Sequence, residues 1–304
     1  MNTNVTCDSA GADRIGVLGL GIMGSAIATN LLARGVAVCG WDPLPAARAS
    51  LGEAGGVVAA DAAQVAASAP VLLTSLPGPA ALMETARTLA HAAARGTVVI
   101  ETSTLDIDDK IAARDLLEQV GVVMLDCPLS GTGAQARSRD LAVYASGPPQ
   151  EIRRVVPFFE RFARTHYDVG TFGNGMRMKL MANLLVAVHN VSTAEALLLG
   201  QRWGISPARA VEVLADGAGG SRMLQVRGPM MQDEGWTAAT MKLSVWQKDM
   251  RLIAAALEKA CVPAPLFSAT VPIYNAALGL GHAEHDTASV FDVLRRMSSA
   301  DPAG

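Results

Sequence analysis

Short apolar runs alternate with longer Ala-rich segments through the first half of the chain. The apolar runs predict buried strands and the longer segments predict helices, which is the pattern of a doubly wound, largely parallel sheet. Ligands of such sheets bind outside the carboxyl ends of the strands. The strands are expected over 14–18, 36–41, 71–75, 97–100, 122–125 and 141–146, with a last short one near Tyr167.

One uninterrupted helix is expected from Met176 to Trp203, where Gly200 is the only Gly or Pro. About 28 residues at ~1.5 Å each would span roughly 42 Å, which is long enough to join two domains. The segment is apolar on nearly every side, with Met181 and Leu185 on its most apolar face. We therefore expect this helix to lie in an interior.

Beyond Gly204 the pattern predicts only helices, over 207–215, 240–259, 265–278 and 287–297. The sequence therefore predicts an α/β protein with an N-terminal Rossmann-type domain, residues 1–173, and an all-helical domain, residues 174–304. The interdomain helix, about 175–203, would connect them.

A glycine-rich turn follows the first strand directly. The turn has the sequence Gly19-Leu20-Gly21-Ile22-Met23-Gly24, and an Ala-rich helix follows it. The glycines would let the backbone approach a pyrophosphate at the positive end of this helix.

The second strand ends in Asp42, about 18 residues after the last glycine, as the dinucleotide-binding pattern requires. Asp42 would accept hydrogen bonds from the ribose hydroxyls, and it could also cap the helix that follows Pro43. Its charge would repel a 2′-phosphate, and no Arg follows Asp42 until Arg48. We therefore expect NAD rather than NADP as cofactor.

Two further loops at strand ends are candidates for contact with the cofactor. The loop 75–78 contains Leu76 and Pro77, and the loop 101–104 ends in Thr104. The second loop has an alternative interpretation as a polar lead into a helix capped by Asp106.

The segment 126–133 has small residues in series after a strand. Around Gly131, successive backbone N–H groups could point at one anion, and Ser130 and Thr132 would add hydroxyl donors. An ordinary loop is the alternative.

Lys179 and Asn183 are polar residues one turn apart on the same side of the long apolar helix. A lysine near a helix end often extends its ammonium group to solvent. However, the positive end of the helix dipole and partial burial would lower the pKa of this ammonium group, as proton transfer near neutral pH requires. Lys179 is therefore a candidate acid/base. His189 lies about 80° around the helix and more than two turns away, so it is expected to be a packed residue.

Composition excludes several partners. Half of the residues are hydrophobic, 17% are charged, the net charge is −3 and no Lys/Arg cluster occurs, so neither nucleic acid nor a membrane surface is expected as a partner. The N-terminus has no signal-peptide pattern and no apolar run is expected to span a membrane, which predicts a cytoplasmic protein. His282 and His285 have ligand-like spacing, but one such pair is weak evidence, and no metal is predicted.

The four cysteines are scattered without a CxxC pair, so free thiols are expected, with neither a disulfide framework nor a zinc site. They are Cys7, Cys39, Cys127 and Cys261.

Four stretches occur in an order that resembles the β-hydroxyacid dehydrogenase family, which includes 3-hydroxyisobutyrate, tartronate semialdehyde and threonate enzymes. They are Gly19-Leu-Gly-Ile-Met-Gly24, Asp126-Cys-Pro-Leu-Ser-Gly131, Gly173-x-Gly175-x-x-x-Lys179-x-x-x-Asn183 and Lys248-Asp249. The resemblance covers nearly the whole chain. It implies a Rossmann domain, a helical C-terminal domain, an active site in the cleft between them and a homo-oligomer.

The resemblance also implies roles for residues. Lys179 would be the general acid/base and Asn183 would orient the substrate. Ser130 and Gly131 would hold the carboxylate of a small substrate, and Lys248 would close over the site, close to both substrate and cofactor. Thr132 stands where the family usually has a second glycine, which implies a narrower or more polar pocket beside the carboxylate.

Other functions share part of this pattern. An imine reductase or a semialdehyde reductase would have the same architecture, but imine reductases usually lack the lysine at position 179. A decarboxylating 6-phosphogluconate enzyme would have a longer helical domain. A dinucleotide-binding scaffold without activity would have no use for Lys179 beside Asn183.

The helical half is rich in Ala, Leu and Val, so a single chain is expected to leave apolar surface exposed. We therefore expect a homodimer or homotetramer in which this surface is covered.

Overall fold

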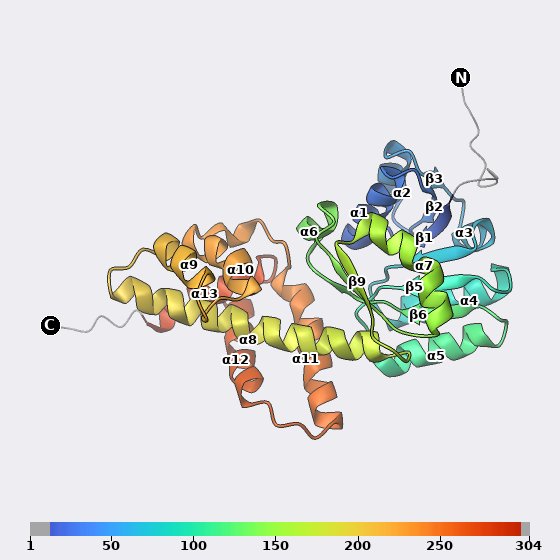
Figure 1. The fold of residues 1–304 in the computed structure, drawn as a ribbon. Coiled ribbons are helices and arrows are strands. Elements are labelled where there is room, and N and C mark those ends of the chain that lie inside the picture. Colours follow the sequence, from blue (N-terminus) through green and yellow to red (C-terminus); the bar gives the residue numbers. More distant parts are fainter. Residues whose placement is uncertain (1–12, 299–304) are drawn as a thin grey trace. The chain divides into compact units, whose positions relative to one another are not determined.

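The computed structural model describes residues 13–298. The chain divides into two compact units, Met1–Lys179 and Leu180–Gly304, which we describe separately (Figure 1).

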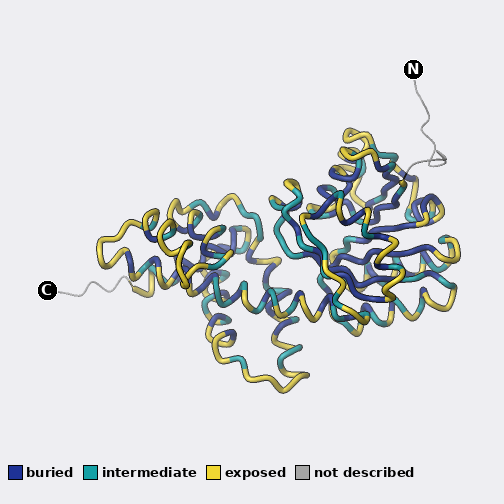
Figure 2. Tube along the Cα trace, viewed as in Figure 1, coloured by how far each residue is buried: buried dark blue, intermediate teal, exposed yellow. Residues whose placement is uncertain are grey.

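The first unit is built on a six-stranded sheet with the order β3-β2-β1-β4-β5-β6, in which every pair of neighbouring strands is parallel. The predicted doubly wound sheet is confirmed. Strands buried on both faces can be apolar along their whole length, and all four residues of β4 and of β5 are buried (Figure 2). The strands are β1 (Arg14–Leu18), β2 (Ala37–Trp41), β3 (Val57–Val58), β4 (Val71–Thr74), β5 (Val98–Glu101) and β6 (Val123–Asp126).

Helices cover both faces of this sheet. Alternate residues of β1 point to opposite faces, so that Ile15 and Val17 belong to one core cluster and Leu18 to another. The first cluster includes residues of α1 and α7, and the second includes residues of α3, α4 and α5. These helices are α1 (Ile22–Leu32), α2 (Pro45–Glu53), α3 (Ala62–Ser68), α4 (Pro79–Ala92), α5 (Ile107–Glu118), α6 (Gly133–Arg137) and α7 (Pro149–Phe162).

A second, three-stranded sheet follows β6. It has the order β7-β8-β9, formed by β7 (Leu129–Ser130), β8 (Ala142–Ala145) and β9 (Thr165–Asp168). A bridge between Asp126 and Ser146 connects the end of β6 to the end of β8.

Several short elements were not predicted from the sequence. They are α2, β3, α3 and α6 in the first unit and α10 in the second. β3, α3 and α6 are short, α2 buries only Leu51, and Gly228 and Pro229 interrupt α10, so none of them shows a clear hydrophobic period. The segment 126–133, interpreted as a loop, contains β7 and the capping residue of α6.

The long helix is confirmed as α8, Asn174–Arg202, but its buried side differs from the expectation. Lys179 and Asn183 are 8% and 5% exposed, whereas Met181 and Leu185 on the apolar face are 62% and 51% exposed. The expectation that this helix lies in an interior on all sides is therefore wrong for the single chain.

The buried polar face of α8 is possible because its amide groups have hydrogen-bond partners. Asn190 Nδ2 donates to the hydroxyl oxygen of Tyr274 and to the carbonyl of Thr287, at 3.1 and 2.9 Å. Contrary to the sequence expectation, α8 is also the one described helix with the length and hydropathy needed to cross a membrane. Core helices of soluble proteins meet the same criterion, so this is weak evidence for a span.

The second unit is helical around the latter part of α8. Its core contains Trp246, Tyr274 and Phe291, and α11 begins at Leu243, three residues later than expected. The remaining helices are α9 (Pro207–Ala215), α10 (Arg222–Gln232), α11 (Leu243–Lys259), α12 (Pro265–Gly279) and α13 (Val290–Met297), with 3-10 turns at Gly235–Thr237 and Thr287–Ser289.

Candidate active site

The glycine-rich turn between β1 and α1 has the geometry of a phosphate-binding loop. Gly19 has a φ of +89°, and a Cβ there would lie 2.2 Å from the carbonyl oxygen of Ser75. A Cβ at Gly24 would lie 1.9 Å from the carbonyl oxygen of Gly19. A Cβ at Gly21 would meet nothing within 4 Å. Two glycines are thus required by close packing, and the third faces open space.

The N-terminus of α1 has no side-chain cap, since its capping residue is Gly21. Backbone N–H groups in the first turn of a helix need acceptors, and the positive end of the helix favours an anion. Ile22 is 69% exposed beside Gly21. This turn therefore fits the pyrophosphate of a dinucleotide.

Asp42 fixes the far side of the same loop. Its Oδ2 accepts a hydrogen bond from the backbone N–H of Leu20 and its Oδ1 accepts one from Leu44, both at 2.8 Å. The predicted helix cap by Asp42 is wrong, because α2 begins at Pro45 with Leu44 as its capping residue and without a side-chain cap. Each carboxylate oxygen of Asp42 has a further lone pair for a ribose hydroxyl. Arg48 Nη1 donates to the carbonyl oxygens of Asp42 and Pro43 at 2.7 and 3.1 Å.

The loops after β4 and β5 lie beside each other at the same edge of the sheet. The backbone N–H of Leu76 donates to Ser103 Oγ at 2.8 Å, and Ser103 precedes Thr104. Pro77 is exposed at this edge. The Asp106 carboxylate accepts from the backbone N–H of Asp108, so the predicted cap of α5 is confirmed.

The segment Ser130–Thr132 is next to the glycine-rich turn. A Cβ on Gly133 would lie 2.3 Å from Ile22 Cγ2, so the start of α6 packs directly on that turn. Gly131 has a φ of +138°, which favours glycine. The hydroxyl group of Thr132 takes part in a capping box with Gln135, so it is engaged in the start of α6.

Lys179 is in the second turn of α8, and the start of this helix is fixed to the carboxyl end of β6. The backbone N–H of Met176 donates to Asp126 Oδ2 at 2.8 Å, and that of Gly175 donates to Ser146 Oγ at 3.0 Å. A Cβ on Gly175 would lie 2.6 Å from the carbonyl oxygen of Asp126, so only glycine fits. With 8% exposure, Lys179 does not have the solvent-extended side chain of the alternative interpretation.

In the second unit Asn183 contacts a residue that the sequence analysis did not assign to the site. Asn183 Nδ2 donates to Asp249 Oδ2 at 2.9 Å, and Asp249 is 6% exposed. Lys248 Nζ lies 3.9 Å from Asp249 Oδ1 and is partly exposed. The sequence signals for Asp249 were its place in the Lys248-Asp249 stretch of the family resemblance and the break that this pair makes in an otherwise apolar helix face.

His282 and His285 contact each other rather than converging on a third ligand. Their Nδ1 atoms are 2.7 Å apart, and His282 Nε2 lies 3.0 Å from Asp292 Oδ2. Within residues 13–298, no group of three or more His, Cys, Asp or Glu side chains is arranged to hold a metal ion.

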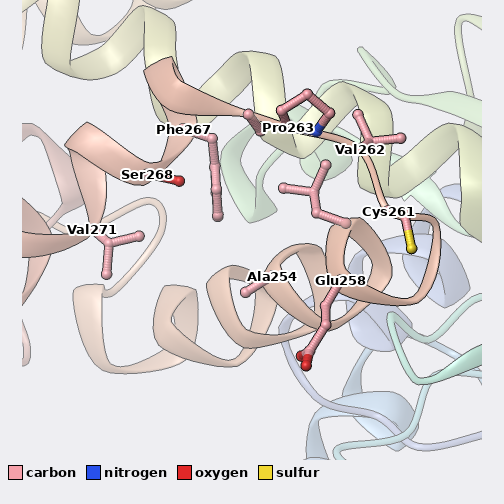
Figure 3. A pocket seen from close by; sticks show the side chains of 10 residues that line it. Ala254, Glu258, Cys261, Val262, Pro263, Phe267, Ser268 and Val271 are labelled. Atoms are coloured by element: carbon pink, nitrogen blue, oxygen red, sulfur yellow. The ribbon is translucent and has the colours of Figure 1, made fainter.

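A groove of about 560 Å³ lies between α11 and α12 (Figure 3). Leu257, Val262 and Phe267 make it largely apolar, and Glu258 and Cys261 lie at its edge. None of the predicted site residues lines it.

The fold and the loops at the sheet edge define a nicotinamide-dinucleotide-dependent oxidoreductase. Residues 14–181 match the model of the NAD-binding domain of 6-phosphogluconate dehydrogenase, and residues 173–294 match that of the NAD-binding domain of NADP-dependent 3-hydroxyisobutyrate dehydrogenase. The chain belongs to the β-hydroxyacid dehydrogenase family, as its motifs indicated.

Relatives cover almost the whole chain. L-Threonate dehydrogenase of Cupriavidus necator is 30% identical over 92% of this chain and 95% of its own. Glyoxylate/succinic semialdehyde reductase 2 of Arabidopsis thaliana is 28% identical over 98% and 84%. The structure of Mycobacterium tuberculosis 3-hydroxyisobutyrate dehydrogenase with L-serine has a TM-score of 0.85 at 28% identity, covering 94% of this chain and 100% of that chain.

The space around Gly24 and Gly21 predicts that the first glycine is needed for folding and the second for cofactor binding. Gly24→Ala should lower the Tm of the protein without cofactor, because its Cβ would collide with the carbonyl oxygen of Gly19. Gly21→Ala should leave that Tm unchanged and weaken NAD binding by about tenfold or more, because the methyl group would occupy the space that the phosphates need. Thermal unfolding and fluorescence titration with NAD measure the two effects. Unchanged NAD affinity in Gly21→Ala would contradict the assigned phosphate site.

Proposed function

We propose that this protein is an NAD-dependent dehydrogenase of small 3-hydroxy carboxylic acids. The observation that carries the proposal is the buried Lys179 on α8, close after the anchored start of that helix. A buried lysine near the positive end of a helix is a candidate for proton transfer. The relatives named as threonate and 3-hydroxyisobutyrate dehydrogenases support the substrate class.

In the proposed mechanism, Lys179 moves the proton of the substrate hydroxyl group. A bound nicotinamide would accept hydride from the carbinol carbon. The neutral amine of Lys179 takes the hydroxyl proton as the C–O bond becomes a carbonyl, and the ammonium returns a proton in the reduction direction. Asn183, held by Asp249, orients the same hydroxyl group.

The substrate carboxylate is proposed to bind at Ser130 and Gly131, and Lys248 is proposed as a further cation that contacts the substrate. Thr132 is proposed to make the pocket beside this carboxylate narrower or more polar, since it stands where the family usually has a second glycine. Holding the carboxylate fixes the distance from the carbinol carbon to the bound cofactor, which is the usual gain from orientation.

Reduction of a semialdehyde is the second candidate function. It is the reverse direction of the same chemistry, and a relative in Arabidopsis thaliana is named as a glyoxylate/succinic semialdehyde reductase. Imine reductases share only the fold, with TM-scores of 0.58 to 0.63 at 16–19% identity.

We propose the cytoplasm as the compartment of this protein. Cys39, Cys127 and Cys261 form no disulfide, which is usual for cytoplasmic proteins; Cys7 lies outside the described residues.

Lys179 provides the direct test of the mechanism. Lys179→Ala and Lys179→Met should each lower kcat by about 10²–10⁴-fold with NAD affinity little changed, because acid/base catalysis typically contributes that factor. The assay is NAD reduction with a panel of 3-hydroxy acids that includes 3-hydroxyisobutyrate and L-threonate. Lys242→Met is the matched control, since Lys242 is exposed and pairs with Glu284. Activity within about fivefold of wild type in either Lys179 variant would refute the proposed role.

The cofactor preference should follow the charge at Asp42. We expect a kcat/KM that favours NAD over NADP, and Asp42→Asn should reduce this ratio because the repulsion of a 2′-phosphate is lost. Arg48→Ala should move the ratio further toward NAD, since Arg48 is the cation beside Asp42. A tenfold preference of the wild type for NADP would overturn the assignment.

The exposed apolar face of α8 supports a homodimer or homotetramer. Met181 and Leu185 are mostly exposed on α8, and Val262 and Leu266 are exposed near the start of α12. Such surface usually marks an interface. Light scattering at micromolar concentration should give a multiple of 31.5 kDa, and Leu185→Glu should lower that mass. A wild-type monomer under these conditions would disprove the proposal.

A further inference from the structure

A fully buried lysine outside the proposed site lies between two carboxylates in the first unit. Lys110 Nζ is 2.7 Å from Glu101 Oε2 and 2.7 Å from Asp126 Oδ1, and all three side chains have no exposed surface. The other buried residues of α5 are Ala113 and Leu117, so Lys110 occupies a position where the helix period would place an apolar residue.

Stability alone gives a weak reason for this arrangement. The desolvation of three charged groups offsets much of their mutual attraction, and apolar replacements of similar volume are often as stable. Burial by itself lowers the pKa of Lys110, but the charges of Glu101 and Asp126 outweigh it and hold the pKa above its ordinary value. The lysine is therefore charged at every pH near neutrality, and Asp126 has a permanent counter-ion.

Glu101, on one side of Lys110, is connected by hydrogen bonds to the loops that are proposed to bind the cofactor. Glu101 Oε1 accepts a hydrogen bond from the backbone N–H of Ser103 at 2.9 Å. The hydroxyl oxygen of Ser103 in turn accepts one from the backbone N–H of Leu76 at 2.8 Å. Glu101 thus holds together the loops that follow β4 and β5.

Asp126, on the other side of Lys110, is hydrogen-bonded to the first turn of α8. Asp126 uses Oδ1 for Lys110 and Oδ2 for the backbone N–H of Met176, three residues before Lys179. Ser146 donates to the carbonyl oxygen of Asp126 at 3.1 Å and accepts from Gly175, so the first turn of α8 is fixed at two adjacent amides. A carboxylate at this end of a helix is also favoured by the helix dipole.

We propose that Lys110 is a positioning residue, which through Glu101 and Asp126 holds the cofactor loops and the first turn of α8 in one arrangement and thereby sets the position of Lys179. This inference rests on the proposed function of Lys179. Lys110 touches neither substrate nor reacting atoms in this scheme. The charge of Lys110 keeps the two buried carboxylates in place. Without it they would face each other unpaired, and one of them would have to take up a proton or move.

The test is a double-mutant cycle between positions 110 and 179. Lys110→Met should lower kcat by about 10- to 100-fold in the wild-type background, since a small misplacement of a reacting group has effects of that size. In the Lys179→Ala background the same substitution should lower kcat by less than about twofold, because the group that it positions is already absent. The isotope effect on kcat with substrate deuterated at the carbinol carbon should rise in Lys110→Met as hydride transfer becomes slower.

A variant of matched stability separates positioning from folding. Val155→Ala removes buried apolar volume in α7 without changing any charge, and should lower Tm while leaving kcat and its isotope effect unchanged at 25 °C. If Lys110→Met does not fold, Ser146→Ala replaces it in the same cycle. It removes one neutral anchor of α8, and it should lower kcat by about three- to tenfold, again only when Lys179 is present.

Equal losses of kcat in both backgrounds, or no loss with wild-type Lys179, would overturn the inference. The two proposals fail in different ways. If Lys179→Ala itself keeps full kcat, the proposed function is wrong. If Lys179→Ala is inactive and the substitutions at Lys110 and Ser146 change nothing, only the positioning role is wrong.

Discussion

The structure depends most on how the start of α8 is attached to the carboxyl end of β6. The Asp126 carboxylate accepts the Met176 amide at 2.8 Å, and Gly175 approaches the Asp126 carbonyl oxygen so closely that any side chain would collide. This contact brings the helix that carries Lys179 to the same edge of the sheet as the dinucleotide loops. A parallel sheet places the carboxyl ends of all its strands along that edge, so one attachment there sets the position of the first turn of α8 relative to these loops.

The polar side of the long helix α8 is buried, whereas its apolar side is exposed in the single chain. Its polar side is buried because Asn183 and Asn190 each find a hydrogen-bond partner within the second unit. Its apolar side, with Met181 and Leu185, is left exposed in the single chain. Burying an amide costs less when it is hydrogen-bonded, as the Nδ2 atoms of Asn183 and Asn190 are, whereas exposed apolar side chains gain free energy when another surface covers them. The proposed site residues and the exposed apolar surface therefore lie on opposite sides of one helix.

The dinucleotide loop depends on packing as much as on ligand contact. Gly19 and Gly24 are required by backbone approaches within the turn itself, and Asp42 is held by the amides of Leu20 and Leu44. The loop is therefore formed in the protein without its cofactor. Preorganisation of this kind lowers the entropy cost of binding.

The sequence by itself determined the α/β class, the long helix and the glycine-rich turn, because each has a local pattern of hydrophobicity or glycine spacing that few other structures share. It also marked Lys179, since a cation in an apolar helix is a local anomaly. The short elements α2, α3, α6 and α10 were missed, because a few residues carry too little periodicity to outweigh tertiary contacts.

Only the tertiary structure decided which groups come together. Nothing in the sequence indicated that Lys110 joins Glu101 to Asp126, or that Asn183 meets Asp249, because these residues are brought together by the crossing of distant elements. Which face of α8 is buried was likewise set by partners far along the chain, such as Tyr274. Local periodicity reports how apolar a face is, whereas its burial depends on what the rest of the chain places against it.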